Sequence, residues 1–243
     1  MVAIGVVLAG AAAAPAADTG AVVRAQAILD RVIANRPARD FSLQGRLIIA
    51  RDESAPLKLL VKILPQETRA IYRTPSMDLL VVQPVGGEAR FFLKGRGELT
   101  GESGWERLLG SAISYHDLGL PFLHWPNPKL IGQERTRGRD CDLIDVTADQ
   151  GPYRRVRMWI DQEYQALMRA DAFNENNDPV KRFAVGSVKR IQQVWVPSSL
   201  EFARVPPGQA LPAQEKSRLE FNTGEQNQDF PAEWFQPEKF GQR

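Results

Sequence analysis

The stretch FSLQGRLIIA at positions 41–50 decides the fold, because large apolar and polar residues alternate along it. The odd-numbered positions from Phe41 to Ile49 are mostly large and apolar, whereas Ser42, Gln44 and Arg46 are polar. A period of two is typical of a β-strand that buries one face and exposes the other. The stretch LKLLVKIL at 57–64 repeats the pattern, so the two segments predict neighbouring strands of one sheet.

Short apolar segments follow in both halves of the chain, separated by turn residues such as Thr74-Pro75-Ser76 and Gly86-Gly87. Closely spaced strands with short connections predict an antiparallel meander, and an open sheet of about 11 strands is expected to curl. The predicted fold class is therefore mainly β (α+β), with a single curved antiparallel sheet. The further predicted strands occupy 67–73, 78–84, 88–94, 129–137, 141–147, 153–160, 166–173, 181–190, 194–203 and 215–222.

Two other segments are predicted to be helical and to cover the concave side of this sheet. Residues 18–36 carry apolar side chains at three- and four-residue spacing, and Pro37 ends the helix. Residues 103–125 mix helix and loop with unusual apolar content, so we expect a mid-chain helical lid. The glycine-rich stretch 94–104 is predicted to be a loop, and the tail from Asn227 an irregular strap across the sheet. No shift in composition marks a boundary, so residues 18–243 are expected to form a single domain.

The N-terminus predicts export. Residues 2–17 carry no charge, are too few to span a bilayer, and end in the signal-peptidase pattern Ala14-Pro15-Ala16. No Lys or Arg precedes this apolar run, but residues 1–17 are still best interpreted as a signal peptide. Ala11 stands where a lipidated cysteine would be, so we expect a soluble exported protein rather than a lipoprotein.

Residues that could carry chemistry are few. The net charge of +2 is too even to indicate a nucleic-acid partner, and the single cysteine, Cys141, excludes an internal disulfide and a cysteine-based metal site. His116 and His124 make no zinc motif, and His116-Asp117 is interpreted as a surface pair rather than a base with its orienting carboxylate. We therefore expect no catalytic residue, no metal, no cofactor and no enzymatic activity.

Arginines cluster on predicted neighbouring strands, where they alternate with apolar residues. They are expected to form the solvated face of the sheet, and the alternative is a docking surface for an acidic partner or lipid headgroups. The residues are Arg135, Arg137, Arg139, Arg154, Arg155 and Arg157. On the opposite, apolar face, periodicity leaves open whether the side chains form a filled core or a pocket.

Several short motifs resemble the outer-membrane lipoprotein-sorting (LolA-like) family. They are GSAISYHDL (110–118), Tyr153-x-x-Val156-x-x-Trp159-Ile160-Asp161, Met168-Arg169-Ala170 ahead of Phe173, and KRFAVGSVKRIQQVWVPSSLEF (181–202). With strand order included, the likeness covers most of residues 40–225. It implies a half-open barrel whose helices form a lid over an apolar cavity. It also implies a soluble periplasmic protein of a Gram-negative envelope that carries the acyl chains of lipoproteins across the periplasm.

The resemblance also implies a binding site and partners. The site would be an apolar cavity with a lid, made by Leu59, Val61, Ile63, Tyr72, Leu80, Phe91 and Phe92, with Leu120, Phe122 and Trp125 in the lid. The partners would be an acylated lipoprotein or lipid, an inner-membrane transporter and an outer-membrane acceptor, and the carrier would act as a monomer. The alternative is an envelope sensor on the same fold that binds lipid or misfolded envelope protein.

Overall fold

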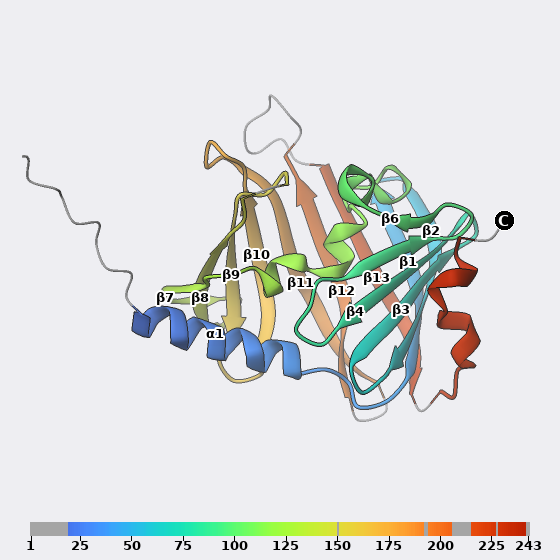
Figure 1. Cartoon of the computed structure of the whole chain (residues 1–243), viewed down its shortest axis with the longest axis horizontal. Helices are drawn as coiled ribbons and strands as arrows, with labels where there is room; N and C mark the ends of the chain where they lie inside the picture. Colours follow the sequence, from blue (N-terminus) through green and yellow to red (C-terminus); the bar gives the residue numbers. More distant parts are fainter. Residues whose placement is uncertain (1–18, 150, 192–193, 206–214, 227, 242–243) are drawn as a thin grey trace, which may run out of the picture.

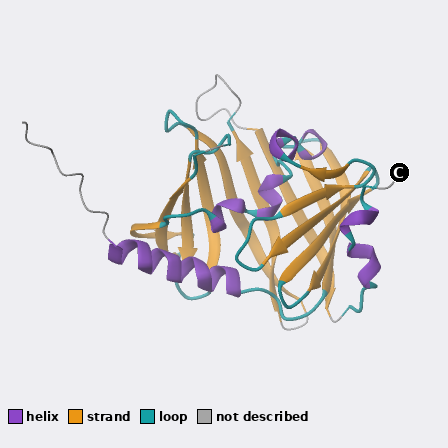
Figure 2. Ribbon diagram, viewed as in Figure 1, coloured by secondary structure: helices purple, strands orange, loops and turns teal. Residues whose placement is uncertain are grey.

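One antiparallel sheet organises the chain (Figures 1 and 2). The computed structural model describes residues 19–149, 151–191, 194–205, 215–226 and 228–241, so the predicted signal peptide lies outside the described residues. The strands of the described part are β1 (Phe41–Ala50), β2 (Glu53–Ile63), β3 (Glu67–Thr74), β4 (Met77–Pro84), β5 (Arg90–Leu93), β6 (Gly97–Leu99), β7 (Lys129–Thr136), β8 (Arg139–Thr147), β9 (Arg155–Asp161), β10 (Ala166–Phe173), β11 (Pro179–Ile191), β12 (Val194–Arg204) and β13 (Glu215–Gln226).

The strand order shows two meanders joined in the middle of the sheet. It runs β6-β5-β4-β3-β2-β1-β13-β12-β11-β10-β9-β8-β7, so the last strand returns to pair with the first. This confirms a mainly β, curved antiparallel sheet, but the described residues form 13 strands where eleven or twelve were predicted. Strand β6 falls in the stretch predicted to be a loop. Three residues with a glycine give no periodic signal, and the strand forms because Leu99 pairs with Phe91 of β5.

The two faces of the sheet are covered by different parts of the chain. Successive side chains of β4 point to opposite faces of the sheet. Leu79 and Val81 belong to a large cluster of buried apolar residues on one face, which we call the inner cluster. Leu80 and Val82 belong to a smaller cluster on the other face, which we call the outer cluster. Residues 228–241, which we call the C-terminal strap, pack on the outer face of β2–β5 and contain η5 (Ala232–Phe235) and η6 (Pro237–Lys239). The expected strap across the sheet is therefore confirmed.

Beyond the strap, ion pairs replace apolar packing on the outer face of β8–β11. Four of the six arginines expected on a solvated face bind a carboxylate of this chain, and Arg135 lies 3.9 Å from Asp140, so the alternative of a docking surface for an acidic partner has little support. The pairs include Arg139–Asp161 at 2.5 Å, Arg155–Asp145 at 3.1 Å, Arg157–Asp145 at 2.8 Å and Arg137–Glu201 at 3.3 Å.

Helix α1 (Thr19–Ala34) confirms the predicted N-terminal helix and lies across the sheet near β7. It buries Ala25 and Leu29 completely in the inner cluster. Its last turn is fixed by Arg31 Nε, which donates to Gln165 Oε1 at 2.8 Å in the β9–β10 turn. None of the helices in the described residues has the length and apolar character needed to cross a membrane.

Residues 101–125, which we call the mid-chain segment, cover the rest of the inner face, but the predicted helical lid is wrong in its secondary structure. The segment forms four short 3-10 turns instead: η1 (Gly101–Trp105), η2 (Leu108–Gly110), η3 (His116–Gly119) and η4 (Pro121–His124). Leu109 and Leu120 adopt left-handed backbone angles, with φ of 48° and 44°, which interrupt any continuous helix. The apolar content that predicted a lid is explained by burial rather than by helical periodicity.

Candidate functional site

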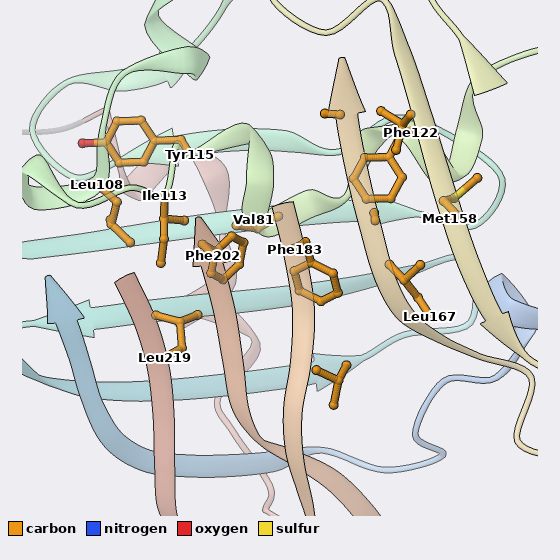
Figure 3. Close-up of a cluster of buried hydrophobic side chains, with 14 of the residues drawn as sticks. Val81, Leu108, Ile113, Tyr115, Phe122, Met158, Leu167, Phe183, Phe202 and Leu219 are labelled. Atoms are coloured by element: carbon orange, nitrogen blue, oxygen red, sulfur yellow. The ribbon is translucent and has the colours of Figure 1, made fainter. Parts of the chain in front are cut away.

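The mid-chain segment places apolar side chains against the inner face of the sheet. Ile113 is fully buried and points toward Phe202 and Leu219 of β12 and β13 (Figure 3). Phe122 of the segment and Met158 of β9 both belong to the inner cluster (Figure 3). The segment thus takes part in one continuous apolar interior with the sheet.

Eight of the ten predicted cavity and lid residues lie in or against this inner cluster. Buried members are Leu59, Val61, Phe91, Phe122 and Trp125, and Ile63, Tyr72 and Leu120 are partly buried against them. Burial raises the pKa of Tyr72 to about 12, so its phenol is neutral at physiological pH.

Leu80 and Phe92 do not join them, and their placement in the cavity was wrong. They pair with one another across β4 and β5 and belong to the outer cluster beneath the C-terminal strap. Neighbouring residues of a strand point to opposite faces, so Phe92 cannot share a face with Phe91. The runs LLVV and FF gave no alternation, because both faces of these strands are covered and a continuous apolar run does not reveal which side is inner.

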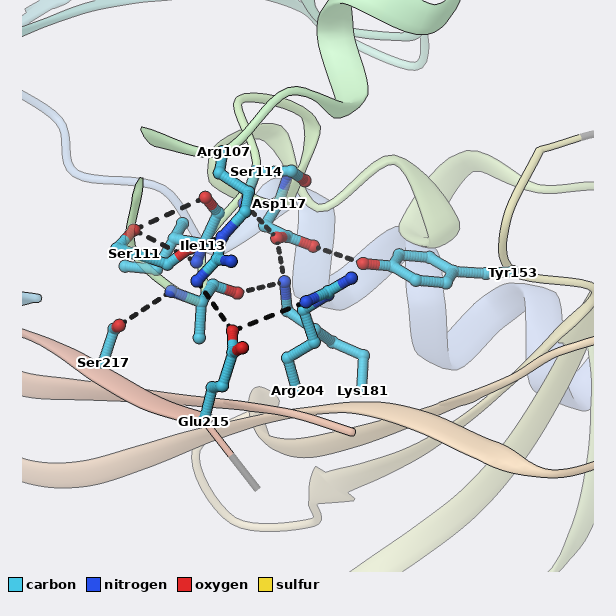
Figure 4. A network of polar contacts seen from close by, with 11 residues as sticks. Arg107, Ser111, Ile113, Ser114, Asp117, Tyr153, Lys181, Arg204, Glu215 and Ser217 are labelled. Carbon is cyan, nitrogen blue, oxygen red and sulfur yellow. Dashed lines mark hydrogen bonds and ion pairs between the residues drawn. The ribbon is translucent and has the colours of Figure 1, made fainter. Parts of the chain in front are cut away.

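A buried polar network fixes the mid-chain segment to the sheet (Figure 4). Lys181 of β11 donates to Asp117 Oδ2 of η3 and to the carbonyl of Ala112, both at 2.5 Å. The Lys181 and Asp117 side chains are only 8% and 7% exposed. A buried ammonium and carboxylate require each other, because either one alone would lose its hydration without compensation.

Two further side chains complete this network. Tyr153, just before β9, donates its hydroxyl to Asp117 Oδ1 at 3.0 Å, and burial beside that carboxylate raises the pKa of Tyr153 well above its usual range. The phenol is therefore a neutral donor. Ser217 of β13 accepts from the amide of Ala112 at 2.8 Å and donates to the carbonyl of Ile49 at 2.6 Å. We call Asp117, Lys181, Tyr153, Ser217 and the backbone of Ala112 the polar latch.

The sequence did not reveal this latch, and the interpretation of His116-Asp117 as a surface pair was wrong for Asp117. Asp117 turns inward to Lys181 and Tyr153, while the His116 ring stacks on Trp105 with centroids 4.5 Å apart. Gly104 allows this stacking, since a Cβ there would lie 2.0 Å from His116 Nε2. The available signal was Lys181 itself, which shares the inward-facing positions of β11 with Phe183 and Val185.

His116 should make the mid-chain segment sensitive to acid. Burial between Trp105 and Phe91 lowers the pKa of His116 below its ordinary value, although Asp117 and Glu88 act in the opposite direction. The pKa of His116 is therefore lower in the folded protein than in the unfolded chain. The contribution of His116 to the free energy of unfolding is complete above the unfolded pKa and is lost as the pH falls through the folded pKa. We expect the urea midpoint to fall more steeply from about pH 7 to about pH 5 in the wild type than in His116→Gln. Parallel pH profiles of the two proteins would contradict this role of His116.

Proteins of known structure share this fold. No curated protein matches the sequence. A DUF1329 family protein from Desulfovibrio piger superposes with a TM-score of 0.75 at 15% identity, covering 90% of this chain and 99% of that one. A domain described as an outer-membrane lipoprotein-sorting protein from Vibrio parahaemolyticus gives 0.76 at 11% identity, covering 91% and 100%.

A LolA-superfamily protein from Nitrosomonas europaea gives a TM-score of 0.60 at 18% identity, covering 87% of this chain and 97% of that one. These similarities show a shared fold and confirm the predicted LolA-like resemblance. A family model described as "Uncharacterized protein" matches residues 97–242, which is more than half of the chain. The chain therefore belongs to the family that this model describes, and it has the fold of the LolA superfamily.

Proposed function

We propose that this protein is a periplasmic carrier that binds acyl chains of lipoproteins or other lipids between its sheet and its mid-chain segment. The observation that carries the proposal is the way in which the mid-chain segment covers the inner face of the sheet. The apolar inner face is closed by a segment of short turns that packs on it with apolar side chains and is joined to it by the polar latch and by the Arg107–Glu215 ion pair at 2.6 Å. Such a covering can separate from the sheet without disrupting any strand pairing.

An acyl chain would replace the apolar side chains of the mid-chain segment against the sheet. Each buried CH₂ contributes about 0.8 kcal/mol, so a sixteen-carbon chain gains roughly 12 kcal/mol in a dry site. A membrane offers about the same, so the carrier and the membrane are near parity. Opening the segment lowers the net gain, which favours release to an acceptor.

The proposed contacts are the predicted residues that the inner cluster brings together. Leu59, Val61, Ile63, Tyr72 and Phe91 would line the site on the sheet, and Leu120, Phe122 and Trp125 would cover it. The proposed carrier is a single monomeric domain that acts after residues 1–17 are removed, and it would meet an inner-membrane transporter and an outer-membrane acceptor. The fold shared with a domain described as a lipoprotein-sorting protein supports this role.

A reversible crosslink across the latch tests the proposal. The amide of Ala112 lies 2.8 Å from Ser217 Oγ, so cysteines at both positions should be within disulfide reach. We expect the oxidised Ala112→Cys/Ser217→Cys protein to bind pyrene-labelled hexadecanoic acid at least about tenfold more weakly than the wild type, because binding needs the segment to open. Reduction should restore the affinity, measured by pyrene fluorescence.

The single variant Ser217→Cys is the control, and Cys141 is buried and should not interfere. Equal affinity of the oxidised and reduced double variant would exclude opening of the segment at this point. Absence of binding by the wild type would exclude the carrier function itself.

A further inference from the structure

The apolar inner face ends in a row of charged side chains on β11, β12 and β13. Lys181 lies opposite Arg204, and Arg204 lies opposite Glu215, so the three side chains form one line across the strands. Because side chains on one face of a strand recur at every second residue, the rows behind this line belong to the same face, and they are mainly apolar. These rows are Phe183–Phe202–Ser217 and Val185–Leu200–Leu219.

The charged row carries more positive than negative charge. Arg107, just before η2 in the mid-chain segment, and Arg204 both bind Glu215 Oε2, at 2.6 Å and 3.4 Å (Figure 4). Among the described residues Glu215 is the only carboxylate that pairs with either arginine, and residues 206–214, which connect β12 to β13, contain no acidic side chain. Lys181 is neutralised by Asp117 in the polar latch. Two guanidinium groups therefore share one carboxylate, which leaves one positive charge without a matching anion.

Both arginines keep hydrogen-bond donors available. Arg204 makes a single hydrogen bond, to Glu215, although a guanidinium group presents several N–H donors. Arg107 uses Nε on the carbonyl of Ser111 at 2.7 Å and one terminal nitrogen on Glu215. The side chains of Arg204 and Arg107 are 31% and 42% exposed, so an anion from solution can reach them. Guanidinium groups bind carboxylates and phosphates with paired, charge-assisted hydrogen bonds.

We propose that Arg204 and Arg107 bind the anionic headgroup, a carboxylate or a phosphate, of an amphiphile whose acyl chain lies on the apolar rows behind them. This inference rests on the proposed carrier function and adds the class of its ligand, an acyl chain with a negatively charged end. The rows next to the charged row belong to the same inner cluster as the proposed acyl contacts Leu59 and Val61. The ligand would therefore be oriented, with its charge at the end of the sheet and its chain toward the interior.

Two probes that differ only in charge test this headgroup site. At about pH 8, pyrene-labelled hexadecanoic acid is a carboxylate, whereas its methyl ester is neutral. We expect the wild type to bind the acid about tenfold more tightly than the ester, because only the acid can accept charge-assisted hydrogen bonds from the arginines. Arg204→Gln should reduce this preference to about threefold or less, and Arg204→Lys should retain more of it, since the charge remains. Hexadecyl phosphate should displace the acid probe more effectively than hexadecanol does, because phosphate is also an anion that guanidinium binds.

Arg46→Gln is the matched control and should keep the full preference. Arg46 and Arg218 also share one carboxylate, that of Glu220, but Arg46 lies on the outer face, since its neighbour Leu47 belongs to the inner cluster. Each variant is scored by the ratio of two affinities, so a general loss of folding would affect both probes and leave the ratio unchanged.

The outcomes separate this site from the carrier function. Equal affinity of the wild type for the acid and the ester would overturn the headgroup site and leave the carrier function in place. A preference that Arg204→Gln keeps at the wild-type level would also overturn it. Binding of neither probe would exclude the carrier function and, with it, the headgroup site that depends on it.

Discussion

Replacing Lys181 by methionine is expected to lower the free energy of unfolding by about 3–5 kcal/mol, because it leaves the Asp117 carboxylate buried without its cation. Methionine fills a similar volume, so the loss of charge and of two hydrogen bonds dominates the effect. The donors that remain, the Tyr153 hydroxyl and the Ser114 amide, are neutral and cannot replace an ammonium group. Urea unfolding followed by circular dichroism measures the change.

A second substitution shows whether the buried charge is the cause. Lys181→Met/Asp117→Asn removes the orphaned charge but keeps a side-chain acceptor for Tyr153, so we expect it to be more stable than Lys181→Met alone. Arg90→Met is the control for an exposed pair. Its partner Glu98 lies at 2.8 Å but is 37% exposed, and a loss of at most about 1 kcal/mol is expected. If Lys181→Met were no more harmful than Arg90→Met, the latch would not stabilise the mid-chain segment.

The fold was predictable wherever one face of a strand is buried and the other is exposed. The observed bounds of β1 (Phe41–Ala50) match those predicted from alternation, and those of β10 (Ala166–Phe173) match the predicted range. Helix α1 was equally clear, because its apolar residues follow the helical period along one face. Short or irregular elements were not predictable, since three residues of β6 and the turns of the mid-chain segment depend on tertiary contacts instead of local pattern.

The residues of the candidate site were predictable only where apolar and polar residues alternate along their strand. Leu59 and Val61 were correctly placed on the inner face, because apolar residues alternate with Lys58 and Lys62 along their strand. Phe91 also faces inward, but the run Phe91-Phe92 contains no alternation from which its face could be chosen. Leu80 and Phe92 were misplaced because the strap, about 140 residues away along the chain, buries the opposite face. The Lys181–Asp117 pair joins residues 64 positions apart, a contact that no local pattern contains.

The inner and outer clusters, on opposite faces of the sheet, contribute differently to its stability. The inner cluster includes the mid-chain segment that the proposed carrier must open. The inner face therefore cannot provide all of the rigidity of the sheet. The outer cluster packs the C-terminal strap on β2–β5 with Phe230, Phe235 and Phe240. We infer that this strap keeps the first meander in place while the inner face exchanges its covering for a ligand.

Replacing Phe235 by alanine should therefore have the second large effect, a loss of about 3–5 kcal/mol in the free energy of unfolding. Phe235 is fully buried in the outer cluster, and its carbonyl accepts from Arg69 at 2.9 Å, so a cavity would form where the strap is attached. We also expect increased fluorescence of anilinonaphthalene sulfonate, because a loosened strap exposes Leu80 and Phe92. Urea unfolding and the dye signal are both measured without ligand.

The neighbouring residue provides the control. Trp234 is larger than Phe235 but 48% exposed, so Trp234→Ala should cost well under half as much despite removing more atoms. The comparison separates burial from side-chain size, since both changes lie in η5 and leave the backbone contact with Arg69 available. If the two variants were equally destabilised, the strap would not be held by the outer cluster. If Phe235→Ala also abolished acyl binding while remaining folded, the two faces would be coupled, and the strap could not be a support that acts independently of the proposed site.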